Sequence, residues 1–158
     1  MKNSLVAVAL IVVPLVIAAA ISYWPPGDAG PPISSVIVLP AKIKASPDLA
    51  YLSDAIAAAL TKHLAGIPGI EVKVPPSSPE VELLKGDYSR LAGPSTAGAV
   101  VLSALTVDAG IYQLDLQILE PQTRRVIWSN SYQSSGVLYN EMIRAAGDGL
   151  RRALQAPD

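Results

Sequence analysis

The stretch AVVLSALTVDAGIYQLDLQIL, residues 99–119, contains two strands and the turn that joins them. Its first seven residues are almost continuously apolar, which is typical of a strand buried on both faces. Asp108, Ala109 and Gly110 follow as a hairpin-turn sequence. In residues 111–119 apolar and polar side chains alternate, so one face of this strand should be buried and the other wet. The stretch therefore predicts an antiparallel strand pair inside a larger sheet.

Downstream, a further strand and a helix are expected to complete the sheet and cover it. Residues 126–132 (VIWSNSY) predict a strand that pairs with the alternating one after a turn at 120–125. A C-terminal amphipathic helix is then predicted from apolar positions at helical spacing. These positions are Tyr139, Met142, Ile143, Ala146, Leu150 and Leu154. Gly147 and Gly149 weaken this helix by about 1 kcal/mol each relative to alanine, and we expect them to allow close approach to the sheet.

Upstream, residues 35–39 (SVIVL) predict another strand buried on both faces. A helix is expected to begin at Ser46, with Pro47 in its first position and Asp48 in its first turn. Gly66 is its expected stop. Its apolar positions are Leu49, Leu52, Ile56, Leu60 and Leu64.

A turn at 67–69 leads to residues 70–74 (IEVKV), which alternate as a half-exposed edge strand does. Residues 75–94 predict a loop that contains helical turns at 81–84 and 88–91. The order β-α-β-(α)-β-β-β-α predicts an α/β (α+β) domain whose mixed sheet is packed by two to three helices.

Residues 5–24 form a charge-free apolar run, long enough as a helix to cross a bilayer. With Lys2 before it, the positive-inside rule predicts a cytoplasmic N-terminus and an exported domain. Tyr23 and Trp24 are expected at the membrane interface together with Lys2. The same stretch also fits a cleaved signal peptide, with an Ala-x-Ala site ending at Ala20, and this reading likewise exports the domain to the periplasm.

The chain therefore divides into an N-terminal transmembrane anchor or signal segment (1–24), a Pro/Gly-rich stalk (25–33) and a folded domain (34–155). Its 158 residues contain no cysteine, which excludes a disulfide framework, a thiolate metal site and a lipid-modified cysteine anchor. The formal charge of -1 gives no general attraction to nucleic acid or anionic lipid.

Four short motifs carry a resemblance to a known family. They are Val38-Leu39-Pro40, Tyr51-Leu52-Ser53-Asp54, Ile67-Pro68-Gly69-Ile70-Glu71-Val72 and Thr123-Arg124-Arg125-Val126-Ile127-Trp128, with Tyr132 behind the last one. The chain from about 34 to 155 resembles bacterial TolB amino-terminal-like domains, which also occur in FlgO-like envelope proteins. Arg124 stands where that family has a turn glycine. The resemblance implies the fold, an exported location and a protein-binding role, and it implies no catalytic residue.

No catalytic or cofactor site is predicted. His63 is the only histidine and is expected at a helix surface or boundary. A metal site needs three or four convergent ligands, which no spacing here supplies. Ser53, Ser103 and Ser129 lack a base at recognisable spacing, so a hydrolase is the least favoured function. The basic pairs at 124–125 and 151–152 are expected to be solvated, with lipid head groups or an acidic partner as the alternative.

The favoured function is a membrane-tethered, non-enzymatic interaction module of the cell envelope, anchored in the lipid bilayer by residues 5–24. An envelope protein is the expected partner, and no pattern specifies an oligomeric state. An edge strand can accept a strand from a partner. The predicted partner contacts are Ile70, Val72, Val74, Trp128 and Tyr132. The alternative function is a periplasmic small-molecule sensor that uses a cleft near the 75–94 loop.

Overall fold

The computed structural model describes residues 33–73, 77–92, 98–136 and 139–155. Residues Pro32–Pro157 form one compact unit. Its elements are β1 (Ser35–Val38), β2 (Lys42–Lys44), the 3-10 turn η1 (Pro47–Leu49), α2 (Leu52–Leu64), β3 (Glu71–Lys73), α3 (Ser78–Leu83), α4 (Ser89–Ala92), β4 (Gly98–Asp108), β5 (Ile111–Glu120), β6 (Arg125–Ser135) and α5 (Tyr139–Gln155). The expected α+β class and mixed sheet are confirmed. Within these described ranges, no helix is both long and apolar enough to cross a membrane.

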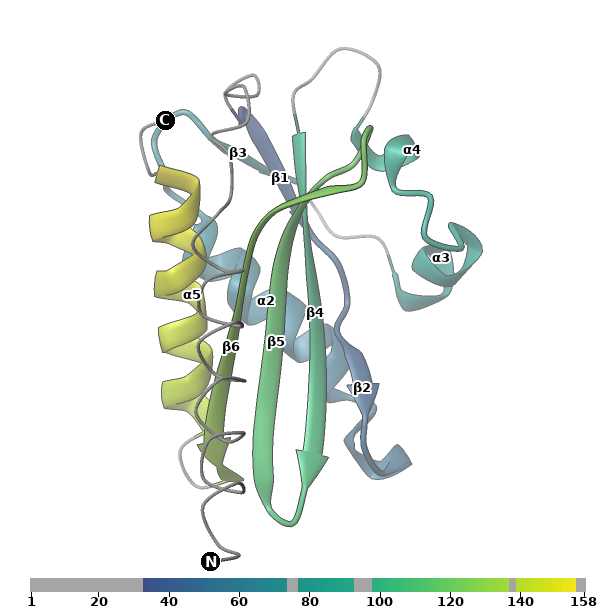
Figure 1. Ribbon diagram of the computed structural model, residues 1–158, viewed down its shortest axis with the longest axis vertical. Helices are drawn as coiled ribbons and strands as arrows, with labels where there is room; N and C mark the ends of the chain where they lie inside the picture. The colour runs from purple at the N-terminus through teal and green to yellow at the C-terminus, as the bar shows by residue number, and fades with distance from the viewer. Residues whose placement is uncertain (1–32, 74–76, 93–97, 137–138, 156–158) are drawn as a thin grey trace, which may run out of the picture. The chain divides into compact units, whose positions relative to one another are not determined.

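The sheet has the strand order β3-β1-β4-β5-β6, and β2 also pairs with β4 (Figure 1). β1 is parallel to β3 and β4, and β2 is parallel to β4. β4, β5 and β6 form an antiparallel meander. The predicted hairpin over residues 99–119 is therefore confirmed, and it provides the centre of the sheet.

β1 and β2 lie end to end along the same side of β4, separated by a break at Pro40. Pro40 has no backbone N–H to donate, so the ladder cannot continue through it. The Leu39 N–H still donates to Val101 O at 3.0 Å, whereas the Ala41 N–H turns to Ser53 O at 3.1 Å. The Ser53 hydroxyl donates in return to Ala41 O at 2.7 Å. The break thus joins the sheet to the start of α2, and β2 was not predicted from the sequence.

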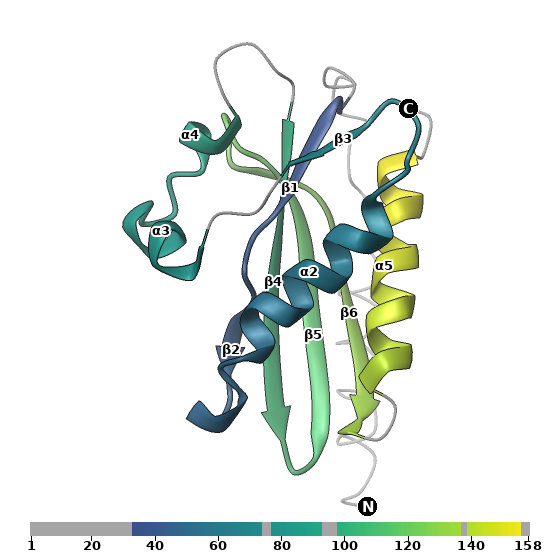
Figure 2. The same cartoon turned by 180° about the vertical axis from the view of Figure 1, so that it is seen from behind.

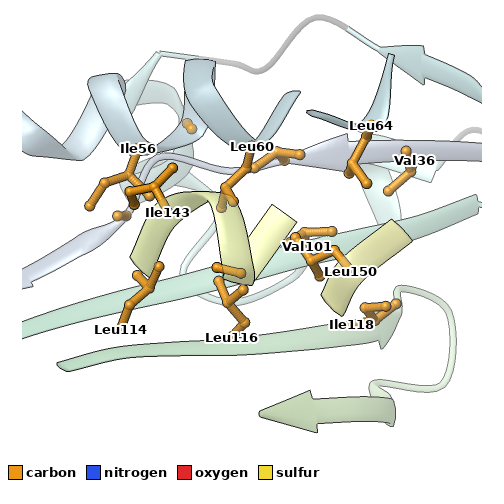
Figure 3. Close-up of a cluster of buried hydrophobic side chains, with 14 of the residues drawn as sticks. Val36, Ile56, Leu60, Leu64, Val101, Leu114, Leu116, Ile118, Ile143 and Leu150 are labelled. Atoms are coloured by element: carbon orange, nitrogen blue, oxygen red, sulfur yellow. The ribbon is translucent and has the colours of Figure 1, made fainter. Parts of the chain in front are cut away.

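α2 and α5 cover one face of the sheet (Figure 2). The core between the helices and this face contains the apolar positions expected from helical and strand spacing (Figure 3). Side chains with at most 1% exposure include Val36, Ile56, Leu60, Leu64, Val101, Leu114, Leu116 and Leu150. The buried residues of this core all lie within the compact unit Pro32–Pro157, so we expect this unit to fold on its own.

A smaller cluster lies on the opposite face of the sheet. Ile37, Leu39 and Val100 are buried there beneath Tyr88 and Leu91. The helical turns predicted within 75–94 are confirmed as α3 and α4. Ser77 and Glu80 form a capping box at the start of α3.

The predicted start of the first helix was wrong. Ser46, Pro47 and Asp48 begin the 3-10 turn η1, in which Ser46 makes no side-chain capping bond, and α2 begins only at Leu52. The hydrogen bonds between Ser53 and Ala41 determine where α2 begins. Because they join residues that are distant in sequence, the start of α2 cannot be predicted from local capping residues. The predicted stop is confirmed, since α2 ends at Leu64 and Gly66 adopts φ +87°.

The β4–β5 turn contains a strained alanine. Ala109 and Gly110 both have positive φ, of 46° and 78°, as a two-residue type I′ turn requires. Because asparagine tolerates this conformation better than alanine, Ala109→Asn should raise the free energy of unfolding by about 0.5–1 kcal/mol. Urea unfolding of the domain measures the change. The same substitution at exposed, helical Ala58 should instead lower stability, and equal effects at the two positions would contradict this explanation.

The two glycines of α5 contact different elements. A Cβ atom on Gly149 would overlap the Tyr132 hydroxyl oxygen, so α5 approaches the sheet closely there, as expected. A Cβ on Gly147 would instead lie 2.5 Å from Cγ of His63 on α2. Gly147 therefore sets the distance between the two helices rather than the distance to the sheet.

Candidate functional site

The predicted contact residues lie in two separate places. Ile70 and Val72 are half-buried near β3 and pack against the main core. Trp128 and Tyr132 are half-buried on the face of β6 that α5 covers. Val74 lies outside the described residues, as do Lys2, Tyr23 and Trp24. The structure therefore does not bring the β3 and β6 residues together into one surface.

β3 is the edge strand that the sequence predicted, but it is short. Its three residues pair with β1, and no second neighbour is described for it. The chain leaves β3 toward residues 74–76, which lie outside the described part. This edge therefore offers few backbone groups to a partner.

β6 is the longer edge of the sheet, and the sequence reading did not identify it as one. It has 11 residues and, in the described part of the chain, pairs only with β5. The backbone groups that face outward can be deduced from the register. Asp108 and Ile111 flank a two-residue turn and so form a hydrogen-bonded pair, and such pairs alternate along antiparallel strands. In β5 the odd-numbered residues therefore bond to β4, and the even-numbered residues bond to the even-numbered residues of β6. The odd-numbered residues of β6, Ser129, Ser131 and Gln133, consequently direct their backbone N–H and C=O groups away from the sheet.

Beyond a β-bulge near its start, this edge lacks the features with which proteins usually protect exposed strands. Residues 126–135 (VIWSNSYQSS) contain no charged residue and no proline. Natural edge strands are commonly blunted by lysine, proline, short length or inward-pointing charge. Val126 and Ile127 are in addition 40% and 46% exposed. The regular stretch 128–135, which follows the bulge, is suited to pairing with another strand.

The sheet face opposite α5 is polar across β5 and β6. The Asp115 carboxylate accepts hydrogen bonds from the Ser131 hydroxyl at 2.6 Å and from Gln113 Nε2 at 3.0 Å. Gln133 Nε2 donates to Gln113 Oε1 at 2.9 Å. The bonds from Ser131 and Gln133 cross from β6 to β5 and hold β6 in register, so its outward backbone groups are presented in a fixed arrangement.

The residues considered for catalysis are dispersed over the fold. The Ser53 hydroxyl donates to Ala41 O, Ser103 is buried at 6% exposure, and His63 packs against Gly147. Within the described ranges, no three acidic, histidine or cysteine side chains are grouped to hold a metal ion. The Ser77 backbone N–H and then its hydroxyl donate to Glu80, and these bonds lower the pKa of that carboxyl. Capping of α3 therefore accounts for Glu80.

One pocket lies next to the segment that the sensor hypothesis invoked. It is lined by residues that include Ser35, Lys73, Leu91 and Pro121. Its volume is about 10 Å³, which is room for about one water molecule, whereas pockets for small-molecule ligands usually exceed about 300 Å³. This pocket therefore does not favour the binding of a metabolite.

Three solved structures are similar to this chain in fold. No protein-family model and no curated protein matches the sequence. The hypothetical protein CT253 from Chlamydia trachomatis superposes with a TM-score of 0.57 at 11% identity, over 78% of this chain and 99% of that one. A PelC variant from Paraburkholderia phytofirmans, solved as a dodecamer, gives 0.51 at 14% identity, over 82% and 96%. TolB from Acinetobacter baumannii gives 0.51 at 12% identity over 79% of this chain, which spans only 29% of TolB. The match to TolB supports the fold that the sequence resemblance implied.

Proposed function

We propose that this chain is a non-enzymatic protein-interaction module of the bacterial cell envelope, which binds a partner protein by strand addition to β6. Residues 5–24 hold it at the cytoplasmic membrane with the N-terminus inside and the domain in the periplasm. The observation that carries the proposal is the 11-residue edge strand β6, which is uncharged from 126 to 135 and unpaired on its outer side in the described structure. Main-chain hydrogen bonds supply affinity in this mode of recognition.

Three further observations support this function. The outward backbone groups of Ser129, Ser131 and Gln133 form a regular row, and hydrogen bonds to β5 fix it in place. The fold is shared with TolB and PelC, and the PelC structure is itself a protein assembly. The sequence of the apolar run at 5–24, followed by the short segment 25–32, supports a location of the domain beside a membrane.

Site-specific cross-linking from β6 tests the proposal. A photoreactive residue at Gln133 in the full-length chain should capture one discrete polypeptide in the membranes of producing cells. Ser129→Pro removes an outward N–H without removing a bond to β5, so it should reduce this adduct about tenfold. Ser129→Ala, the matched control, keeps the N–H and should leave the yield unchanged.

A second cross-linking position and a second proline variant make the test decisive. A photoreactive residue at exposed Lys62 on α2 should not give the same adduct. Ser131→Pro should act as Ser129→Pro does, with Ser131→Ala as its control. The proposal fails if the adduct persists in both proline variants while circular dichroism shows that they are folded, or if Lys62 captures the same protein as efficiently.

A further inference from the structure

Charge is segregated along the domain, although the whole chain is almost neutral. We call one end the tether end: there β1 begins, the β5–β6 turn lies and α5 ends (Figure 1). The register places Gly98, at the start of β4, beside Ser35, and Val100 beside Leu119 near the end of β5. Ser35 and Pro121 line the same small pocket, so the β5–β6 turn is adjacent to the point where the chain enters the sheet.

The tether end exposes an excess of basic side chains. Arg124 and Arg125 lie on the β5–β6 turn, and Arg151 and Arg152 lie on the last turns of α5. Glu120 pairs with Arg125 at 3.6 Å. The charges of Arg124 and Arg90 act on the Asp87 carboxylate. On β3, Lys73 and Glu71 contribute one charge of each sign. Glu120 and Asp87 partly offset Arg125 and Arg124, whereas no ion pair is described for Arg151 or Arg152, so the net charge of this end is positive.

The opposite end has the reverse balance. It comprises the β4–β5 turn, the starts of α5 and α2, η1 and β2, and its carboxylates outnumber its basic side chains. The carboxylates are those of Asp48, Asp54, Asp108 and Glu141, and the basic side chains are those of Lys42, Lys44 and Arg144. The domain therefore carries a charge asymmetry along the direction of its strands, which a sum over the whole sequence conceals.

Exposed apolar side chains adjoin the arginines of the tether end. Val126 and Ile127 follow Arg125 directly and are 40% and 46% exposed. The register shifts between Ile118, which pairs with Trp128, and Leu119, which pairs with Val126. Ile127 is thus an extra residue at a β-bulge, a feature that re-aims side chains. Apolar and arginine side chains together suit the interface between lipid head groups and acyl chains.

The segment between the apolar run and the domain is too short for the tether end to lie far from a membrane. Only residues 25–32 separate the apolar run 5–24 from the described domain. Eight residues span at most about 28 Å, so the tether end stays close to the bilayer surface. Arginines in this position attract anionic phospholipids.

We propose that the tether end docks on an anionic phospholipid surface through Arg124, Arg125, Arg151 and Arg152, with Val126 and Ile127 entering the head-group region. This docking orients the domain with its acidic end away from the membrane and leaves residues 129–135 of β6 accessible. This docking rests on the proposed function, in which residues 5–24 anchor the chain in the membrane. It is a second contact with lipid that the tether alone does not require.

Vesicle binding of the isolated unit Pro32–Pro157 tests this contact without the anchor. The domain should co-sediment with phosphatidylcholine vesicles that contain one third phosphatidylglycerol, less at high salt, and not with pure phosphatidylcholine vesicles. Arg124→Gln with Arg151→Gln should reduce the partition coefficient roughly 30-fold. Lys42→Gln with Lys44→Gln changes the net charge equally at the opposite end and should have no such effect. Ile127→Ser should also weaken binding.

Several results would overturn the docking proposal. They are no binding to the anionic vesicles, equal binding to the neutral ones, or equal losses in the arginine and lysine pairs. If the arginine pair leaves vesicle binding unchanged but abolishes the Gln133 adduct in cells, the basic surface recognises an acidic protein instead. None of these results depends on Ser129→Pro, so failure here is distinguishable from failure of the strand-addition function.

Discussion

Leu60→Ala is expected to lower the free energy of unfolding of the domain by about 3 kcal/mol. Leu60 has no exposed surface and lies on the face of α2 that packs against the sheet and α5 (Figure 3). Its truncation removes buried apolar surface and leaves a cavity that the rigid sheet beneath it cannot close. Urea unfolding of Pro32–Pro157, followed by circular dichroism, measures the loss.

The same substitution on the surface serves as a matched control. Leu83 on α3 is 80% exposed, so Leu83→Ala removes the same atoms from a site that water already reaches. It should change the free energy of unfolding by less than about 0.5 kcal/mol. Similar losses at the two positions would show that α2 does not form the core as described.

Gly147→Ala should cost about 2 kcal/mol, although alanine is the better helix former by about 1 kcal/mol. The added Cβ would lie 2.5 Å from Cγ and 2.8 Å from Cβ of His63. Because the His63 Cβ is fixed to the α2 backbone, rotation of the ring cannot relieve the overlap and the helices must separate. Thermal and urea unfolding measure the effect.

A double-mutant cycle identifies the contact responsible. His63→Ala removes the ring atoms but keeps Cβ, so Gly147→Ala should cost less in that background without becoming neutral. Asp148→Ala, at an exposed neighbouring position on α5, should leave stability nearly unchanged. If Gly147→Ala stabilises the protein as helix propensity alone predicts, the close approach of α2 and α5 is wrong.

Most of the fold follows from periodicity, because one buried face imposes a repeat on each long element. Leu114, Leu116 and Ile118 alternate along β5, and Met142, Ile143, Ala146 and Leu150 repeat along α5. All of these side chains are buried as predicted.

The prediction failed where tertiary contacts determine the presence or the start of an element. β2 exists because β4 is long enough to pair with Lys42–Lys44 beyond the break at Pro40, and α2 begins where Ser53 binds Ala41.

The candidate surfaces were harder to predict than the fold, for two physical reasons. Alternation identifies a strand but not its neighbours, so the edge position of β6 became visible only from the sheet order. The sequence feature that could have indicated β6 as a binding edge is the absence of charged residues and proline from 126 to 135. The two arginine pairs were noted separately, with lipid head groups or an acidic partner as the alternative to solvation, but their position at one end of the domain was not predicted because Arg124 and Arg151 are distant in sequence.

Amide hydrogen exchange, resolved by residue, tests the central claim about β6 most directly. The measurement compares Pro32–Pro157 alone with its complex with the protein captured from Gln133. In the free domain the N–H groups of Ser129, Ser131 and Gln133 should exchange fast, while their even-numbered neighbours, bonded to β5, exchange slowly. In the complex all of them should be slow. Slow exchange of the odd-numbered residues in the free domain, or fast exchange in the complex, would contradict strand addition at this edge.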